Sequence, residues 1–181
     1  MPEPTRPSGF LVWLLGAWIA LTITTTWVAT TNFVVLKPGR LERSDEVVKG
    51  LEPGPPRAMA LRYVASSLNR RFFEGYGLAQ MLCALTAMSI VARRYTREKW
   101  LVGLVAFALV AALVFRYWIV RELSELGPQL DFIPTSMVSE ERQRFDFIHQ
   151  VSVYLEVAKL AVLVAASFLA IRRLQSVPTS K

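Results

Sequence analysis

The chain has 181 residues, of which 53% are hydrophobic and only 19% are charged, and it carries a net charge of +7. Soluble domains carry about 25% charged residues, so the composition argues against a soluble domain and is typical of a membrane protein. The basic charge does not indicate nucleic-acid binding, because no stripe of Lys and Arg is interleaved with aromatic residues that could stack on bases.

Four apolar stretches, each long enough to cross a lipid bilayer, occupy more than half of the chain. They cover about residues 10–36, 72–92, 100–120 and 147–171. A helix rises about 1.5 Å per residue, so about 20 apolar residues span the roughly 30 Å hydrocarbon core. The pattern predicts an all-α integral membrane protein, in which a single domain (1–181) forms an antiparallel four-helix transmembrane bundle.

The first span is rich in threonine and carries three tryptophans. Threonine hydroxyls can bond to carbonyls of the preceding turn and let neighbouring helices approach closely. The apolar run is longer than the roughly 7–15 residues of a signal-peptide core, so we interpret it as a retained anchor. Lys37-Pro38-Gly39 is predicted to end the helix.

The connection 37–71 divides into two parts. Residues 50–56 (GLEPGPP) form a chain-breaking segment, and residues 57–71 place apolar side chains at helical spacing between arginines. This second part predicts either an interfacial amphipathic helix before the second span or an extension of that span. Cys83, the only cysteine, lies inside the second span, which excludes a disulfide within the chain and a cysteine-based zinc site.

Residues 92–100 are short enough to join the second and third spans as a helical hairpin. In the connection 121–146, Gly127-Pro128 and Ile133-Pro134 are predicted to break the chain. Ser139, followed by two glutamates, is predicted to cap a new helix.

The charge distribution predicts the orientation of the spans. The termini and the turn at 93–99 are short and hold eight basic residues against two acidic ones, whereas the connection 121–146 is acidic. The connection 37–71 also holds eight basic residues, against four acidic ones, and competes by number but not by density. By the positive-inside rule we expect both termini to be cytoplasmic, and the connections 37–71 and 121–146 to lie on the non-cytoplasmic side of a cell (inner) membrane.

Polar side chains inside the spans are the candidate functional residues, because burying them in lipid is costly. The fourth span holds His149, Ser152, Glu156 and Lys159, and the second span adds Glu74 and Gln80. Glu156 and Lys159 are three residues apart and can form an ion pair, while His149 and Glu156 share a helix face. This candidate intramembrane polar site could serve a function, or it could be a neutralised pair that only fixes helix packing.

His149 is the only histidine, which excludes a bis-histidine haem within one chain. A single axial ligation by His149, alone or with Met81 or Met88, stays open, as does a quinone or a chlorophyll-type pigment. No catalytic constellation and no metal-ligand spacing is present, so we predict no catalytic residue, no metal and no obligatory cofactor.

Several short motifs point to a family. The first span contains Gly16-Ala17-Trp18 and Asn32-Phe33, the second opens with residues 69–73 (NRRFF) and Tyr76-Gly77, and the fourth opens with residues 144–150 (RFDFIHQ) followed by Tyr154. In this order they resemble the small four-span membrane proteins similar to transmembrane protein 205, a domain family of unknown function. The resemblance implies a four-helix membrane domain over nearly the whole chain and implies no mechanism.

Three functions are compatible with this sequence. The first is a non-enzymatic accessory or scaffold subunit, which acts through helix contacts with other membrane subunits or with itself. The second is a cofactor- or quinone-binding redox subunit that uses His149, and the third is a proton or small-solute carrier that uses Glu156 and Lys159.

Overall fold

The computed structural model describes residues 9–36, 55–131, 133, 137 and 139–175, and within these residues all regular structure is helical. The helices are α1 (Gly9–Val35), α4 (Pro55–Arg94), α5 (Lys99–Val114), α6 (Val120–Leu130) and α7 (Glu140–Gln175). A single π-helical turn, η1 (Phe115–Ile119), joins α5 to α6, so that residues 99–130 form one continuous helical rod.

Four of these helical segments are long and apolar enough to cross a membrane: Gly9–Val35, Ala58–Arg94, Lys99–Leu130 and Glu140–Gln175. The prediction of an all-helical structure with four apolar helices of membrane-spanning length is therefore confirmed for the described residues. Each long helical segment except the first extends well beyond the apolar stretch that predicted it. The additional turns at the helix ends contain polar residues, which hydropathy did not count as part of the span.

Residues 57–71 belong to α4 and continue into the second span without a break. Of the two predicted alternatives the structure therefore has the extension, and no separate interfacial helix is formed by these residues. Lys37-Pro38-Gly39 and the segment 50–54 lie outside the described residues.

The prediction that Gly127-Pro128 breaks the chain was wrong, because both residues lie inside α6, which continues to Leu130. Proline removes one helical hydrogen bond and its ring crowds the carbonyl four residues back, yet the helix continues, with Leu126 and Leu130 buried on either side of it. Ser139 does cap the next helix as predicted, since its Oγ accepts a hydrogen bond from the Arg142 backbone N–H at 3.3 Å.

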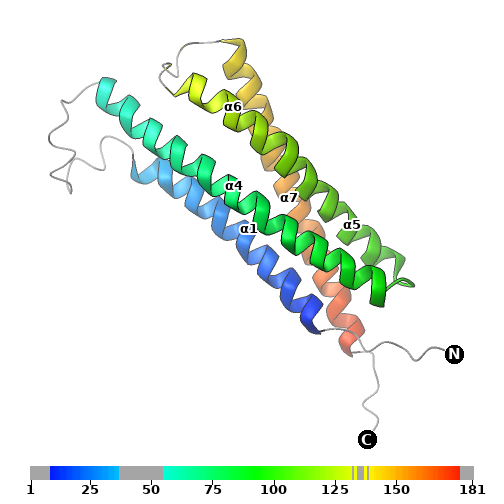
Figure 1. Cartoon of the computed structure of the whole chain (residues 1–181). Helices are drawn as coiled ribbons and strands as arrows, with labels where there is room; N and C mark the ends of the chain where they lie inside the picture. Colours follow the sequence, from blue (N-terminus) through cyan, green and yellow to red (C-terminus); the bar gives the residue numbers. More distant parts are fainter. Residues whose placement is uncertain (1–8, 37–54, 132, 134–136, 138, 176–181) are drawn as a thin grey trace, which may run out of the picture.

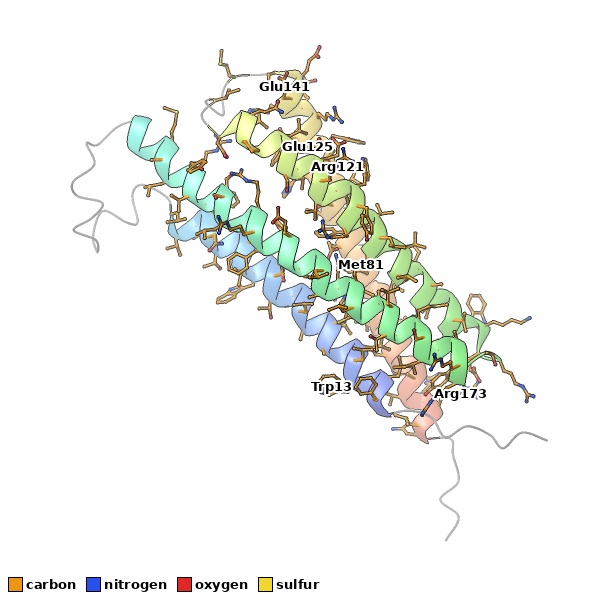
Figure 2. All side chains as sticks on the ribbon, viewed as in Figure 1. Trp13, Met81, Arg121, Glu125, Glu141 and Arg173 are labelled. Atoms are coloured by element: carbon orange, nitrogen blue, oxygen red, sulfur yellow. The ribbon has the colours of Figure 1, made fainter. Side chains whose placement is uncertain are left out.

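The four long segments pack as a bundle in which α1 contacts α4 and α7, and α5 contacts the same two helices from the other side. Fully buried alanines bring the helices close together at these interfaces (Ala84, Ala87, Ala108, Ala112, Ala166 and Ala170). Large apolar side chains such as Trp13 project outward instead, away from the bundle (Figure 2). Outward apolar side chains suit a lipid environment rather than water.

The two ends of the bundle are different. The start of α1 and the end of α7 lie at one end, and α6 and the first turns of α4 and α7 lie at the other (Figure 1). At the first end Arg173 pairs with Glu98 at 2.7 Å, and at the second Arg144 pairs with Glu122 at 2.6 Å. Between the ends lie two hydrophobic clusters, one around Trp18 and Val105 and one around Tyr76 and Phe115.

Candidate functional site

A fully buried lysine lies where the two hydrophobic clusters meet. Lys159 on α7 has no exposed surface, and its Nζ donates to both carboxylate oxygens of Glu156 at 2.7 Å. The same nitrogen lies 2.6 Å from Gln80 Oε1 and 2.8 Å from the Tyr76 hydroxyl oxygen on α4. All three ammonium hydrogens therefore have acceptors, as a buried cation requires.

Helix periodicity explains how these four side chains meet. Glu156 and Lys159 are three residues apart on α7, and Tyr76 and Gln80 are four residues apart on α4, so each pair lies on one helix face. α4 and α7 lie opposite each other, since each packs on α1 and α5, and the two pairs of side chains meet between them in the centre of the bundle. We call these four residues the lysine cluster.

Aromatic rings surround the ammonium group on its other sides. The ring centroids of Tyr76, Phe115 and Trp18 lie 5.1, 5.9 and 6.0 Å from Lys159 Nζ. A cation close to an aromatic face gains about 0.5–2 kcal/mol, more where water is excluded. The rings thus offset part of the cost of removing the lysine from water.

Tyr76 extends the lysine cluster to a third helix. Its hydroxyl donates to Glu156 Oε2 at 2.5 Å and lies 3.1 Å from Thr22 Oγ1 on α1. Thr22 in turn donates to the Trp18 carbonyl one turn earlier, at 3.0 Å. A continuous row of polar contacts therefore connects α1, α4 and α7 through the centre of the bundle.

The π-helical turn η1 places an aromatic wall beside this cluster. Phe115 is buried and meets Tyr76 edge to face, with ring centroids 5.4 Å apart and planes at 82°. Next to it, Gly77 allows close approach of the neighbouring helix, because a Cβ there would lie 2.8 Å from Arg116 Cδ. π-Turns occur often at functional sites.

A groove of about 540 Å³ lies between α1 and α7 and reaches the lysine cluster. Glu156, Tyr76 and Thr22 line its polar part, together with Ser152 and His149 further along α7. Its other walls are mostly apolar and include Ile23, Trp27, Val153, Val157 and Leu160. The groove therefore combines a lipid-like surface with a short row of hydrogen-bonding groups.

The structure brings some of the candidate residues together and leaves others apart. Glu156, Lys159 and Gln80 are in direct contact, whereas Ser152 and His149 share only the groove with Glu156. Glu74 is exposed and makes none of the contacts of the lysine cluster. The site analysis of the sequence missed Tyr76, Thr22, Trp18 and Phe115, and only the four-residue spacing of Tyr76 and Gln80 could have indicated one of them.

The arrangement bears on the possible cofactors. His149 is exposed in the groove and stacks on Phe145, with ring centroids 6.3 Å apart. Met81 and Met88 pack against the other hydrophobic cluster, around Trp18, so neither is placed as a second axial ligand for His149. Among the described residues no group of three His, Cys, Asp or Glu could hold a metal ion.

Comparisons with protein-family models, with curated proteins and with solved structures found no match to this chain. The resemblance to the proteins similar to transmembrane protein 205 therefore stays a prediction.

Proposed function

We propose that this protein binds a lipid-soluble molecule with a hydrogen-bonding head, of the quinone class, in the groove between α1 and α7. The observation that carries the proposal is the groove itself, whose apolar walls lead to His149, Ser152 and Glu156 on one face of α7. Its volume of about 540 Å³ lies within the range of about 300–1,000 Å³ typical of ligand pockets.

The polar groups of the groove suit a quinone head. Quinone carbonyl oxygens accept hydrogen bonds, which the Ser152 hydroxyl and the His149 ring can donate. The hydroxyl groups of the reduced form donate, and the partly exposed Glu156 carboxylate can accept. The isoprenoid tail matches the apolar walls formed by side chains such as Ile23 and Leu160.

The proposal includes the placement of the chain in a membrane. The four helices would cross a cell membrane as an antiparallel bundle, with both termini and the turn between α4 and α5 on the cytoplasmic side. The density of Lys and Arg in these short segments supports this orientation. The groove between α1 and α7 would then open toward lipid, from which a quinone can enter.

Tryptophan fluorescence tests the proposal directly. Quinones quench tryptophan, and Trp27 lines the groove, whereas Trp13 on the same helix is equally exposed but does not line it (67% and 65%). Titration of the detergent-purified protein with decylubiquinone should give saturable quenching, which Trp27→Phe should reduce clearly more than Trp13→Phe, since Trp18 beside the lysine cluster remains in both variants. The absence of saturable quenching, or equal losses in the two variants, would refute the proposal.

A polar-head variant adds a second readout. His149→Ala should weaken quinone binding about fivefold, the value of one neutral hydrogen bond of about 1 kcal/mol. Tyr154→Ala removes an exposed side chain of α7 that does not line the groove. The affinity of this variant for decylubiquinone should stay within about twofold of the parent protein's, as expected for a surface substitution.

The second candidate function is that of an accessory subunit, with a helix of another membrane subunit or of a second copy seated in the same groove. The specific observation in its favour is that threonines of α1 line the groove (Thr22, Thr25, Thr26 and Thr30), since small polar residues permit close helix contact. The mass of the protein in mild detergent distinguishes the two: a stable complex that excludes decylubiquinone supports the subunit, and a quinone-binding monomer argues against it.

A further inference from the structure

A second cavity, of about 260 Å³, lies at the end of the bundle formed by α6 and the first turns of α4 and α7. Three arginines line it, Arg62 and Arg70 from α4 and Arg142 from α7, and Asp131 is the one carboxylate on its wall. We call it the arginine pocket. Phe73 and His149 line both this cavity and the groove between α1 and α7, so the two adjoin, but Arg62 and Arg142 line only the arginine pocket.

Only one of the three arginines is neutralised by the aspartate. Arg70 Nη2 pairs with Asp131 Oδ2 at 2.9 Å, and Asp131 is almost fully buried. Ser66 completes the pair, donating to Asp131 Oδ1 at 2.5 Å and accepting from Arg70 Nη1 at the same distance. Gly127 permits this packing, because a Cβ there would lie 2.8 Å from Arg70 Nη1. The hydrogen bonds of the Asp131 carboxylate therefore go to Arg70 and Ser66, and Arg62 receives only its longer-range attraction.

The other two arginines converge on one neutral atom. Arg62 Nη1 and Arg142 Nη2 each donate to the Ile133 carbonyl oxygen at 3.3 Å. The two nitrogens are therefore no more than twice that distance apart, although both groups are positive. A carbonyl dipole does not balance two full charges, and their repulsion is considerable where water is partly excluded.

Unused donors remain on the same groups. Arg142 Nε is buried and has no hydrogen-bond partner among the described residues. Guanidinium groups present planar sets of N–H donors that match the oxygens of phosphate in bidentate fashion. Two convergent guanidinium groups, one of them with a buried unpaired donor, next to a third that is already paired, have the charge and geometry of an anion site.

We infer that the arginine pocket binds a phosphate group through Arg62 and Arg142. The group belongs either to a phospholipid headgroup or to a free phosphate. Basic pockets between transmembrane helices bind phosphorylated lipid headgroups on the cytoplasmic side of membranes, and the same pairing of guanidinium with phosphate can serve at the opposite side. The phenylalanines on the cavity wall, Phe33, Phe73 and Phe145, supply the apolar contact that an acyl chain needs.

Thermal unfolding of the purified full chain in mild detergent tests the inference, because a ligand that binds the folded state raises its Tm. One arm adds sodium phosphate against sodium chloride of equal ionic strength. The second adds phosphatidylglycerol against phosphatidylcholine in mixed micelles. A rise with phosphate alone identifies a soluble anion, and a rise with phosphatidylglycerol alone identifies a lipid headgroup. A rise in neither arm overturns the inference without recourse to any variant.

Variants then locate the site. Arg62→Gln combined with Arg142→Gln should weaken binding of the active probe at least about tenfold, because each loses charge-assisted hydrogen bonds. Arg121→Gln is the matched control at the same end of the bundle, since Arg121 lies on the outer face of α6 and pairs there with Glu125 (Figure 2). An equal loss of affinity in Arg121→Gln would show that binding depends on surface charge in general, and would refute phosphate binding in the arginine pocket.

Discussion

The ion pair at the centre of the lysine cluster should be strongly coupled, and a double-mutant cycle can measure the coupling. Lys159→Met keeps an unbranched side chain of similar length but removes the charge. It leaves the Glu156 carboxylate, only 15% exposed, with the Tyr76 hydroxyl as its remaining partner. Glu156→Gln does the reverse and leaves a fully buried ammonium with Gln80 and Tyr76.

The structure sets the size of the effect. Removing one member of a buried ion pair costs about 3–5 kcal/mol, because the other charge stays buried without compensation. The combined variant carries neither charge, so no uncompensated charge stays buried in it. We therefore expect the combined variant to lose at least about 2 kcal/mol less than the sum of the single losses.

The free energy of unfolding, followed by circular dichroism during denaturant titration in micelles, measures each corner of the cycle. Arg121 and Glu125 form an exposed pair at 2.9 Å, with side chains 74% and 58% exposed, and serve as the matched control. Their coupling should stay below about 0.5 kcal/mol. Additive losses at Lys159 and Glu156, with a coupling no larger than that of the control, would show that the buried pair contributes nothing specific.

Two further predictions concern helix contacts. Asn69→Leu should destabilise the protein by about 1 kcal/mol in thermal unfolding, and by more than Asn32→Leu does. Asn69 accepts a hydrogen bond from Asn32 at 2.7 Å and also donates one to a carbonyl of α1 at 3.0 Å, so its loss removes two contacts. Equal losses of stability in the two variants would contradict this. Gly75→Ala should have a higher melting temperature than Gly77→Ala. Alanine favours the helix at both positions, but only at Gly77 would its Cβ meet Arg116, at 2.8 Å. A higher melting temperature for Gly77→Ala would contradict this packing.

Local sequence patterns predicted what depends on neighbouring residues. The length of the apolar stretches predicted four helices, and the three-residue spacing of Glu156 and Lys159 predicted their pairing. The Ser139 cap was predicted because a cap is a contact across a single turn. Gly127-Pro128 was misinterpreted, since the outcome there depends on side chains of α6 that pack on other helices.

Contacts between helices decided the rest. No spacing along the chain links Thr22 to Tyr76, or Arg62 to Arg142, because each pair lies on different helices whose rotation and register are set by packing. No spacing along the chain indicated the π-helical turn at Phe115 either, nor the choice of Gln80 rather than Glu74 as a partner of Lys159.

The sequence by itself determined that this chain forms apolar helices of membrane-spanning length, because hydrophobicity and helical periodicity are properties of consecutive residues. Only the tertiary structure decided that Lys159 is surrounded by three aromatic rings, that a groove opens beside Glu156, and that two arginines converge on one carbonyl oxygen. These features arise where side chains from different helices meet. They depend on how the helices pack together, which no single segment of the sequence determines.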